Sequence, residues 1–246
     1  MKKQPCQQAR VFPAVSRSKP GEKGNFGLGR GKKKSGRPGY GTIVQGGGIL
    51  PYAQFADQDG APLPIVQGHS MSYLETAGNG KLLDWKYYPL EDYKHTASIG
   101  STQDVLINTG GSYEFFKGFD LDVRYQHQRQ TFNGRSLYDV ESYYARDLIN
   151  SFTQIRTDGT VIHNVPVGGI LDQSNSILNS NSFRGQLNYS KKWARHEINA
   201  LAGTELRLTQ NTGSSNRLYG YDDGILTFGT VDYRNTYPDF ISGSQG

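Results

Sequence analysis

Residues 104–130, DVLINTGGSYEFFKGFDLDVRYQHQRQ, decide the fold class of this chain. In 104–116 the charged and amide side chains all stand at even positions, while Val105, Ile107, Tyr113 and Phe115 stand at odd ones. Residues 120–130 alternate in the same way. Because successive side chains of a strand point to opposite faces, both runs read as strands with one apolar and one polar face. The dipeptide Lys117-Gly118 between them predicts a tight turn, and therefore a long antiparallel hairpin.

A second hairpin follows the same pattern. Residues 183–190 and 197–210 alternate on either side of a short basic turn at 191–193. The expected polar faces of the two hairpins carry Arg124, Arg184, Glu205 and Arg207, and Leu201 is the single apolar break in the polar face of 197–210. These four charged side chains could touch cargo or another domain, or pair with one another across adjacent strands.

Alternation alone leaves two folds open, because a soluble antiparallel sheet with one solvated face alternates as well. Three of the four runs exceed the ~5–6 residues usual in soluble strands and match the ~9–11 that cross a bilayer at a tilt. The polar faces are nearly continuous, and aromatic residues lie near the expected strand ends, as in a water-filled outer-membrane barrel. Short turns combined with long polar connections at 131–180 and 211–246 favour the same plan. We therefore predict an all-β chain that forms part of an antiparallel transmembrane β-barrel with long extracellular loops.

The long connection at 131–180 contains predicted structure of its own. Ser136 is a candidate N-cap for a short helix with Leu137, Val140, Tyr144 and Leu148 on one face. Residues 157–160, TDGT, predict a tight turn between two short extended segments at 152–155 and 161–162.

Basic residues are concentrated at the N-terminus. Residues 1–40 hold eleven lysines and arginines and one acid, Glu22, so their charge is 11 minus 1, or +10, whereas the whole chain carries +5. Such an arm could neutralise nucleic-acid phosphates, remain disordered without a partner, or be non-native residues from a wrong start or a shifted frame. We expect 1–48 to be a disordered or non-native tail that does not bind nucleic acid, and 49–246 to be the folded barrel segment.

The sequence contains little that indicates catalysis. The five histidines have no second ligand at metal-binding spacing, and Asp57-Gln58-Asp59-Gly60 lacks the later acids of a calcium loop. The serines show no nucleophile-elbow pattern, and the single cysteine, Cys6, excludes an internal disulfide. There is no run of 18 apolar residues that would predict a membrane helix. We predict no enzyme activity, no cofactor and no metal site.

Several short sequence motifs occur along the chain in a recognisable order. They are PYAQ at 51–54 with DG at 59–60, LLDWKYYPL at 82–90, YYARDLIN at 143–150, GGILDQS at 168–174, ALAGTE at 200–205 and RLYGY at 217–221. From about residue 49 to 240 the chain resembles the middle of the barrel in SusC/RagA-type TonB-dependent outer-membrane transporters.

That resemblance implies a 22-stranded barrel with an N-terminal plug in the cell outer membrane. It also implies import of oligosaccharides or peptides, with a SusD-like surface lipoprotein, the TonB complex and outer-membrane lipid as partners. We find no plug, TonB-contacting segment, signal peptide or closing strand in the sequence. We therefore expect a fragment of a transporter, from a truncated or wrongly framed gene, that cannot transport alone because an open sheet leaves edge groups unpaired in lipid.

Flat aromatic rings in the expected loops are candidates for stacking on sugar rings. The predicted ligand-binding residues are Trp85, Tyr87, Tyr138, Tyr143, Tyr144, Tyr219 and Tyr221. Packing of the loops on one another is the competing explanation, and for any single one of these aromatics it is the better one. The second functional class that stays open is a soluble or surface β-rich module that binds glycans.

Overall fold

The computed structural model describes residues 9–11, 22–35 and 53–244. Its strands are β1 (Ala9–Val11), β2 (Glu22–Ser35), β3 (Thr96–Phe116), β4 (Phe119–Tyr138), β5 (Thr153–Ile155), β6 (Val161–His163), β7 (Gly169–Trp193), β8 (His196–Asp222) and β9 (Thr227–Gly229). Its helices are α1 (Met71–Thr76), the 3-10 turn η2 (Ala77–Gly80), α2 (Pro89–Asp92) and α3 (Tyr143–Ser151).

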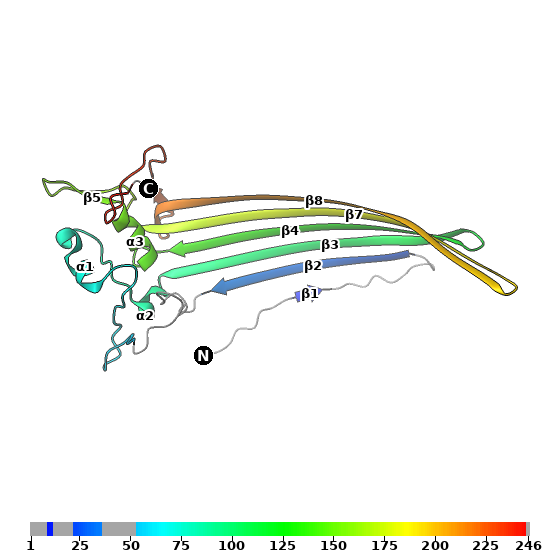
Figure 1. Cartoon of the computed structure of the whole chain (residues 1–246), viewed down its shortest axis with the longest axis horizontal. Coiled ribbons are helices and arrows are strands. Elements are labelled where there is room, and N and C mark those ends of the chain that lie inside the picture. The colour runs from blue at the N-terminus through cyan, green and yellow to red at the C-terminus, as the bar shows by residue number, and fades with distance from the viewer. Residues whose placement is uncertain (1–8, 12–21, 36–52, 245–246) are drawn as a thin grey trace. The chain divides into compact units, whose positions relative to one another are not determined.

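One sheet contains seven strands in the order β1-β2-β3-β4-β7-β8-β9, and β5 pairs with β6 in a second sheet. Figure 1 shows β3, β4, β7 and β8 as long strands side by side. The chain is mostly β, and its large sheet is antiparallel, as the alternating pattern predicts. Both predicted hairpins are present, and the first turn lies at Lys117-Gly118 as predicted. The second turn lies at Ala194-Arg195, so the predicted turn at 191–193 is wrong, because these residues continue β7. Gly118 has a φ of +86°, a conformation that glycine adopts without strain.

Contacts between side chains fix how β4 lies against β7. Asn133 bonds to Asn175, His127 bonds to Asn181, and the ring of Phe119 stacks on Tyr189. As the residue number falls along β4, the number of its partner on β7 rises by the same amount, as antiparallel pairing requires. The same register places Arg124 level with Arg184.

The register between β7 and β8 follows in the same way. Ser180 bonds to Thr209, and the carboxylate of Asp172 accepts from the guanidinium of Arg217. This pairing places Arg184 level with Glu205 and Phe183 level with Leu206. Apolar and polar side chains therefore stand on opposite faces across three neighbouring strands.

The long strands extend further than the sequence pattern predicted. β4 continues to Tyr138, β7 begins at Gly169 and β8 continues to Asp222, so the predicted loops at 131–180 and 211–246 are wrong at these ends. In these extensions polar side chains bond across the sheet: Asn216 to Gln173 and Ser176 to Asn211. Cross-strand amide and hydroxyl bonds hold a strand together where hydrophobic alternation is absent.

The predicted start of the helix at Ser136 is also wrong, although Tyr144 and Leu148 of its expected face do lie in α3. Ser136 lies in β4 and bonds to Ser98 of β3, and the helix α3 begins after Ser142. The Ser142 hydroxyl accepts from the backbone N–H of Ala145, as an N-cap does. The turn at 157–160 is confirmed, because β5 and β6 pair on either side of it.

Part of the expected N-terminal tail is strand rather than disordered chain. β1 pairs with β2, and contacts of Gly27 with Leu106 and of Gly29 with Asp104 set β2 beside β3. The alternation of glycine with Phe26, Leu28 and Arg30 suits a strand, which charge counting overlooked. The rest of the predicted tail, with Cys6, and the residues Pro51 and Tyr52 lie outside the described residues.

The chain divides into two compact units. The strand unit comprises 1–33, 100–134 and 174–215, and the loop unit comprises 34–99, 135–173 and 216–246. All buried hydrophobic residues in the described part of the chain belong to the loop unit: Ile65, Trp85, Tyr87, Ala145, Ile149, Val165, Ile170 and Leu171. Among the residues described, no helix is both long and apolar enough to cross a membrane.

The core of the loop unit is organised by α3. Ile149 is fully buried, and Asn150 both accepts from the N–H of Leu83 and donates to its carbonyl oxygen, at 3.0 and 2.9 Å. The indole N–H of Trp85 donates to Asp147 at 2.7 Å. The segments LLDWKYYPL (82–90) and YYARDLIN (143–150) therefore pack against each other in the core of the loop unit.

Candidate functional site

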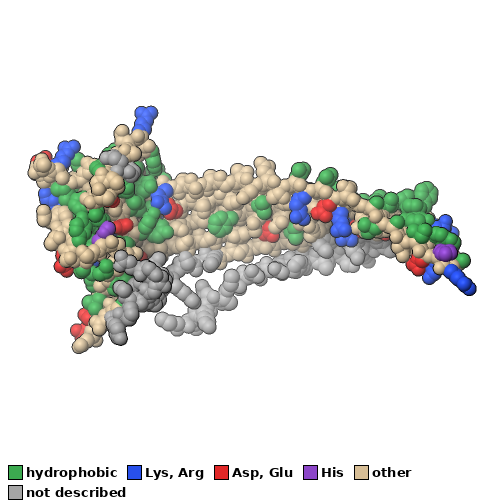
Figure 2. Space-filling model, in the orientation of Figure 1, with side chains coloured by type: hydrophobic (Ala, Val, Ile, Leu, Met, Phe, Trp, Pro, Cys, Tyr) green, Lys and Arg blue, Asp and Glu red, His purple; other side chains and the backbone are tan. Residues whose placement is uncertain are grey.

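The polar face of the strand unit brings charged side chains from three strands together. Arg124 comes from β4, Arg184 from β7, and Glu205 and Arg207 from β8. They are the four residues that alternation placed on the polar face. Figure 2 shows basic and acidic side chains close to one another over the strands.

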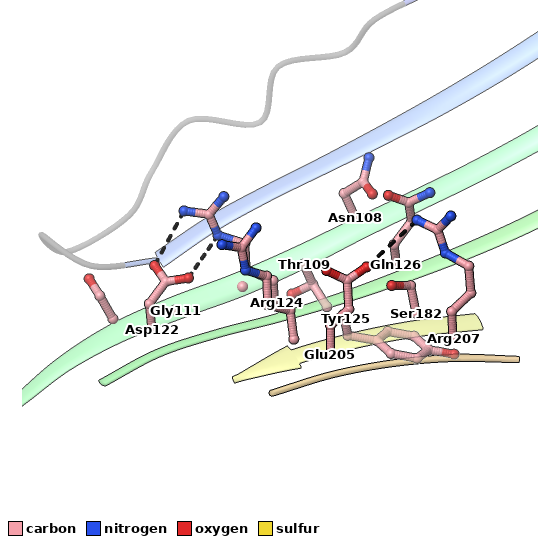
Figure 3. Close-up of a pocket in the computed structure, with 13 residues that line it drawn as sticks. Asn108, Thr109, Gly111, Asp122, Arg124, Tyr125, Gln126, Ser182, Glu205 and Arg207 are labelled. Carbon is pink, nitrogen blue, oxygen red and sulfur yellow. Dashed lines mark hydrogen bonds and ion pairs between the residues drawn. The ribbon is translucent and has the colours of Figure 1, made fainter. Parts of the chain in front are cut away.

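These side chains line a hollow of about 620 Å³ that is open to solvent. Its lining residues are Asn108, Thr109, Gly110, Gly111, Ser112, Asp122, Arg124, Tyr125, Gln126, Ser182, Arg184, Glu205 and Arg207. In Figure 3 Arg124 lies beside Asp122, while Arg207 lies beside Glu205 and Gln126 further along the strands. Three guanidinium groups and two carboxylates leave the hollow with a net charge of +1.

Ion pairs in this hollow run along the strands. Nε of Arg124 donates to Asp122 at 2.8 Å, and a guanidinium nitrogen of Arg207 lies 3.8 Å from Glu205. Arg184 donates to the amide oxygen of Gln186 at 3.0 Å. Pairing across adjacent strands, one of the alternatives that the sequence left open, is not seen among these four residues.

Glycine forms the floor of the hollow on β3. A β-carbon at Gly110 would lie 2.9 Å from the carbonyl oxygen of Val123 and 3.1 Å from Cγ of Arg124. Any side chain at this position would clash with the backbone of β4 at Val123, because a real Cβ almost never approaches a neighbour within 3.0 Å, and it would also press on the Arg124 side chain. Gly110 thus makes room for the Arg124 side chain.

Three of the predicted loop aromatics belong to the interior of the loop unit. Trp85 is 3% exposed and Tyr87 is 8% exposed, so the protein itself covers their rings. Tyr143 packs on Tyr87 with ring centroids 5.1 Å apart, and its hydroxyl donates to the carbonyl of Gln67. These rings pack on the loop unit, which is the alternative that the sequence left open.

Two further predicted aromatics form a more open cluster. The rings of Tyr138 and Tyr144 lie 4.6 Å apart, and the guanidinium of Arg217 lies 5.6 Å from the Tyr144 ring centre. Arg217 holds both carboxylate oxygens of Asp172, at 2.6 and 2.7 Å. An exposed ring beside a fixed guanidinium can bind a planar or anionic group.

Tyr219 and Tyr221 lie near the end of β8. Tyr219 pairs with Gly229 of β9, and the ring of Tyr221 has the guanidinium of Arg135 5.9 Å from its centre. Arg135 in turn donates to Asp223 at 2.6 Å. The structure thus separates the seven predicted aromatics into a buried group and two half-exposed groups.

Burial controls the ionisation of the loop-unit tyrosines. The pKa of Tyr143 is well above its usual 10.0, because burial disfavours the phenolate and the Asp147 carboxylate adds repulsion. At neutral pH this phenol is therefore a neutral hydrogen-bond donor. At the exposed turn the pKa of Asp158 is lowered, because its carboxylate accepts from the backbone N–H of Thr160.

No group of three or more His, Cys, Asp or Glu side chains in the described ranges could hold a metal ion. A smaller cavity of about 270 Å³ in the loop unit is lined by Pro62, Tyr88, Glu91, Asp92, His95, Glu141 and Arg146. Asp92 in it accepts from the backbone N–H of Tyr143, and Arg146 holds backbone carbonyls, so both serve the fold.

Sequence reasoning found the charged and polar residues of the hollow but not which of them face one another across the strands. Asp122, Gln126 and Asn108 were visible as polar-face residues, yet nothing in the sequence placed Arg124 level with Arg184. That relation depends on the strand register, which turn lengths and cross-strand contacts set together.

Comparison with known proteins adds no family assignment. No protein-family model matches the chain, and no curated protein matches its sequence.

Proposed function

We propose that this chain forms part of the wall of an outer-membrane transporter of the SusC/RagA TonB-dependent type. In this role the apolar face of the strand unit contacts lipid, and the polar face lines a water-filled passage for oligosaccharides or peptides. A 22-stranded barrel, an N-terminal plug, a SusD-like lipoprotein and the TonB complex belong to the same proposal. The proposal is supported by the sequence motifs that resemble this family and by the geometry of the strand unit.

One observation carries the proposal: both faces of the strand unit are exposed, and one of them is apolar. Leu206 and Leu208 are 64% and 76% exposed, and Ile198 and Phe183 on the same face are 46% and 42% exposed. Moving a large apolar side chain out of water contributes about 1.5–3 kcal/mol. A row of such side chains that none of the described residues covers is suited to contact with acyl chains.

The opposite face has the properties that a passage requires. It carries Arg124, Arg184, Glu205 and Arg207 without an apolar cover, and these charges would be costly in hydrocarbon. Lipid on one side and water on the other satisfies both faces at once.

Spin labels test this orientation. Single cysteines replace Leu121 and Leu206 on one face and Arg124 and Arg207 on the other, in a Cys6→Ser background of the complete gene product in membranes. We expect oxygen, which concentrates in lipid, to relax labels at 121 and 206, and a water-soluble nickel chelate to relax labels at 124 and 207. The reverse pattern, or equal access of both reagents to all four labels, rejects the proposal.

A second candidate is a soluble or surface module that binds glycans. It is favoured by the loop unit, which has a hydrophobic core of its own and half-exposed tyrosines beside Arg217. A product that stays monodisperse in buffer without detergent and binds glycans through Tyr144 would support this candidate over the transporter.

A further inference from the structure

We propose that the hollow on the polar face binds a carboxylate-bearing oligosaccharide, such as a chain of uronic acids. This inference deepens the proposed function and rests on it, because it names the class of cargo that the passage would accept.

The first argument is a pair of like charges. The register set by Asn133 with Asn175 and His127 with Asn181 brings Arg124 level with Arg184 on neighbouring strands. Side chains directly opposite on adjacent strands have Cβ atoms ~4.5–5.5 Å apart, and like charges there are destabilising. An anion between two guanidinium groups turns this repulsion into attraction.

The second argument concerns the neighbouring carboxylates. Asp122 is held by Arg124 at 2.8 Å, and Glu205 lies closest to Arg207 at 3.8 Å. Arg184 has a neutral amide as its partner and no carboxylate within ion-pair distance in the described part of the chain. Its guanidinium has five N–H donors, so it can still receive both oxygens of an incoming carboxylate.

The third argument favours a sugar acid over an acidic peptide. The row next to the arginines carries Asn108, Gln126 and Ser182, whose amides and hydroxyl can bond to ring hydroxyls. Tyr125 is the only aromatic side chain in this lining, and its ring offers one flat face for a sugar ring to stack on.

The test is calorimetric titration of the complete gene product in detergent with four ligands. These are tetragalacturonate, its fully methyl-esterified counterpart, tetraglutamate and inorganic phosphate. We expect tetragalacturonate to bind at least roughly tenfold tighter than the uncharged ester, because charge-assisted hydrogen bonds are stronger than neutral ones. Equal binding of acid and ester, tighter binding of tetraglutamate or phosphate, or no binding of tetragalacturonate overturns the inference.

Variants assign the binding to the hollow. Arg184→Gln should weaken tetragalacturonate binding roughly tenfold, whereas Arg156→Gln, which removes the same charge from the exposed turn of the loop unit, should leave it unchanged. Glu205→Gln should strengthen binding, since it removes a competing acid, and a variant that merely fails to fold would not gain affinity. Equal losses in Arg184→Gln and Arg156→Gln, or weaker binding by Glu205→Gln, would contradict the proposal.

The spin-label experiment separates the two proposals. If the labels report lipid at Leu206 and water at Arg207 but tetragalacturonate does not bind, the transporter wall stands and the cargo assignment falls.

Discussion

Arg146 shows how one charged residue becomes part of a core. It is 9% exposed, and its guanidinium donates to the carbonyl oxygens of Asp84 and Lys86 at 2.8 and 3.3 Å and lies 3.4 Å from the Asp84 carboxylate. The sequence marks Arg146 only as an arginine in a helical stretch. The packed segment that it holds comes from sixty residues earlier, which no local pattern reveals.

Replacing Arg146 by methionine should destabilise the loop unit by about 1–3 kcal/mol, because the change leaves the part-buried carbonyl oxygens of Asp84 and Lys86 without their guanidinium donor. The fluorescence of Trp85 during urea unfolding measures this loss in a Trp193→Phe background, which leaves Trp85 as the only tryptophan. The exposed Arg156→Met is the control and should change stability by less than about 0.5 kcal/mol. Equal effects of the two variants would show that the Arg146 contacts contribute nothing.

The raised pKa of Tyr143 predicts that the loop unit loses stability at alkaline pH. Its pKa in the folded state is raised above the 10.0 of the unfolded chain, so the folded state binds this proton more tightly. The associated stability is fully present below pH 10.0 and is lost as the pH rises above it. Tyr143→Phe should therefore lose less stability between neutral and strongly alkaline pH than the parent, measured by Trp85 fluorescence. Tyr233→Phe, at a 78% exposed position, should behave like the parent, and an unchanged slope in Tyr143→Phe would disprove the assignment.

At the scale of elements, the sequence was informative where side chains alternate. The cores of β3, β4, β7 and β8 and the turn at Lys117-Gly118 were predictable, because period two and turn residues are local signals. The polar ends of the same strands were not, since Asn175, Asn133 and Asn211 form strands only through partners on neighbouring strands. The start of α3 was predicted at Ser136 but lies at Ser142, because Ser136 bonds to Ser98 on the neighbouring strand.

The turn between β3 and β4 gives a prediction at this scale. A β-carbon at Gly118 would meet the carbonyl oxygen of Ser190 on β7, and the φ of +86° adds strain for any other residue. Gly118→Ala should therefore raise amide exchange in the β3–β4 hairpin. The matched control is Gly60→Ala, at a φ of +84° with open space around it, which should cost only the ~1–2 kcal/mol of the left-handed conformation. If both variants lose the same free energy of local opening, the contact with Ser190 has no part in holding the hairpin.

At the scale of the whole molecule, the two units differ in what stabilises them. The loop unit buries Trp85, Ile149 and Leu171, whereas the described part of the strand unit has no buried hydrophobic residue. A sheet with both faces exposed gains little from the hydrophobic effect, which is the dominant favourable term in folding. Its apolar face must be covered by something other than this unit.

This contrast predicts that detergent slows amide exchange in the strand unit but not in the loop unit. In buffer without detergent, amides of β8 between Ile198 and Leu208 should exchange rapidly, while those of α3 around Ile149 should be protected by the core. Detergent micelles cover the apolar face and should slow exchange in β8 by at least tenfold, with little change in α3. Mass-resolved hydrogen exchange on the same sample measures both, so α3 is an internal control for folding. Slow exchange of the β8 amides in plain buffer would mean that a protein layer, rather than lipid or detergent, covers Leu206 and Leu208.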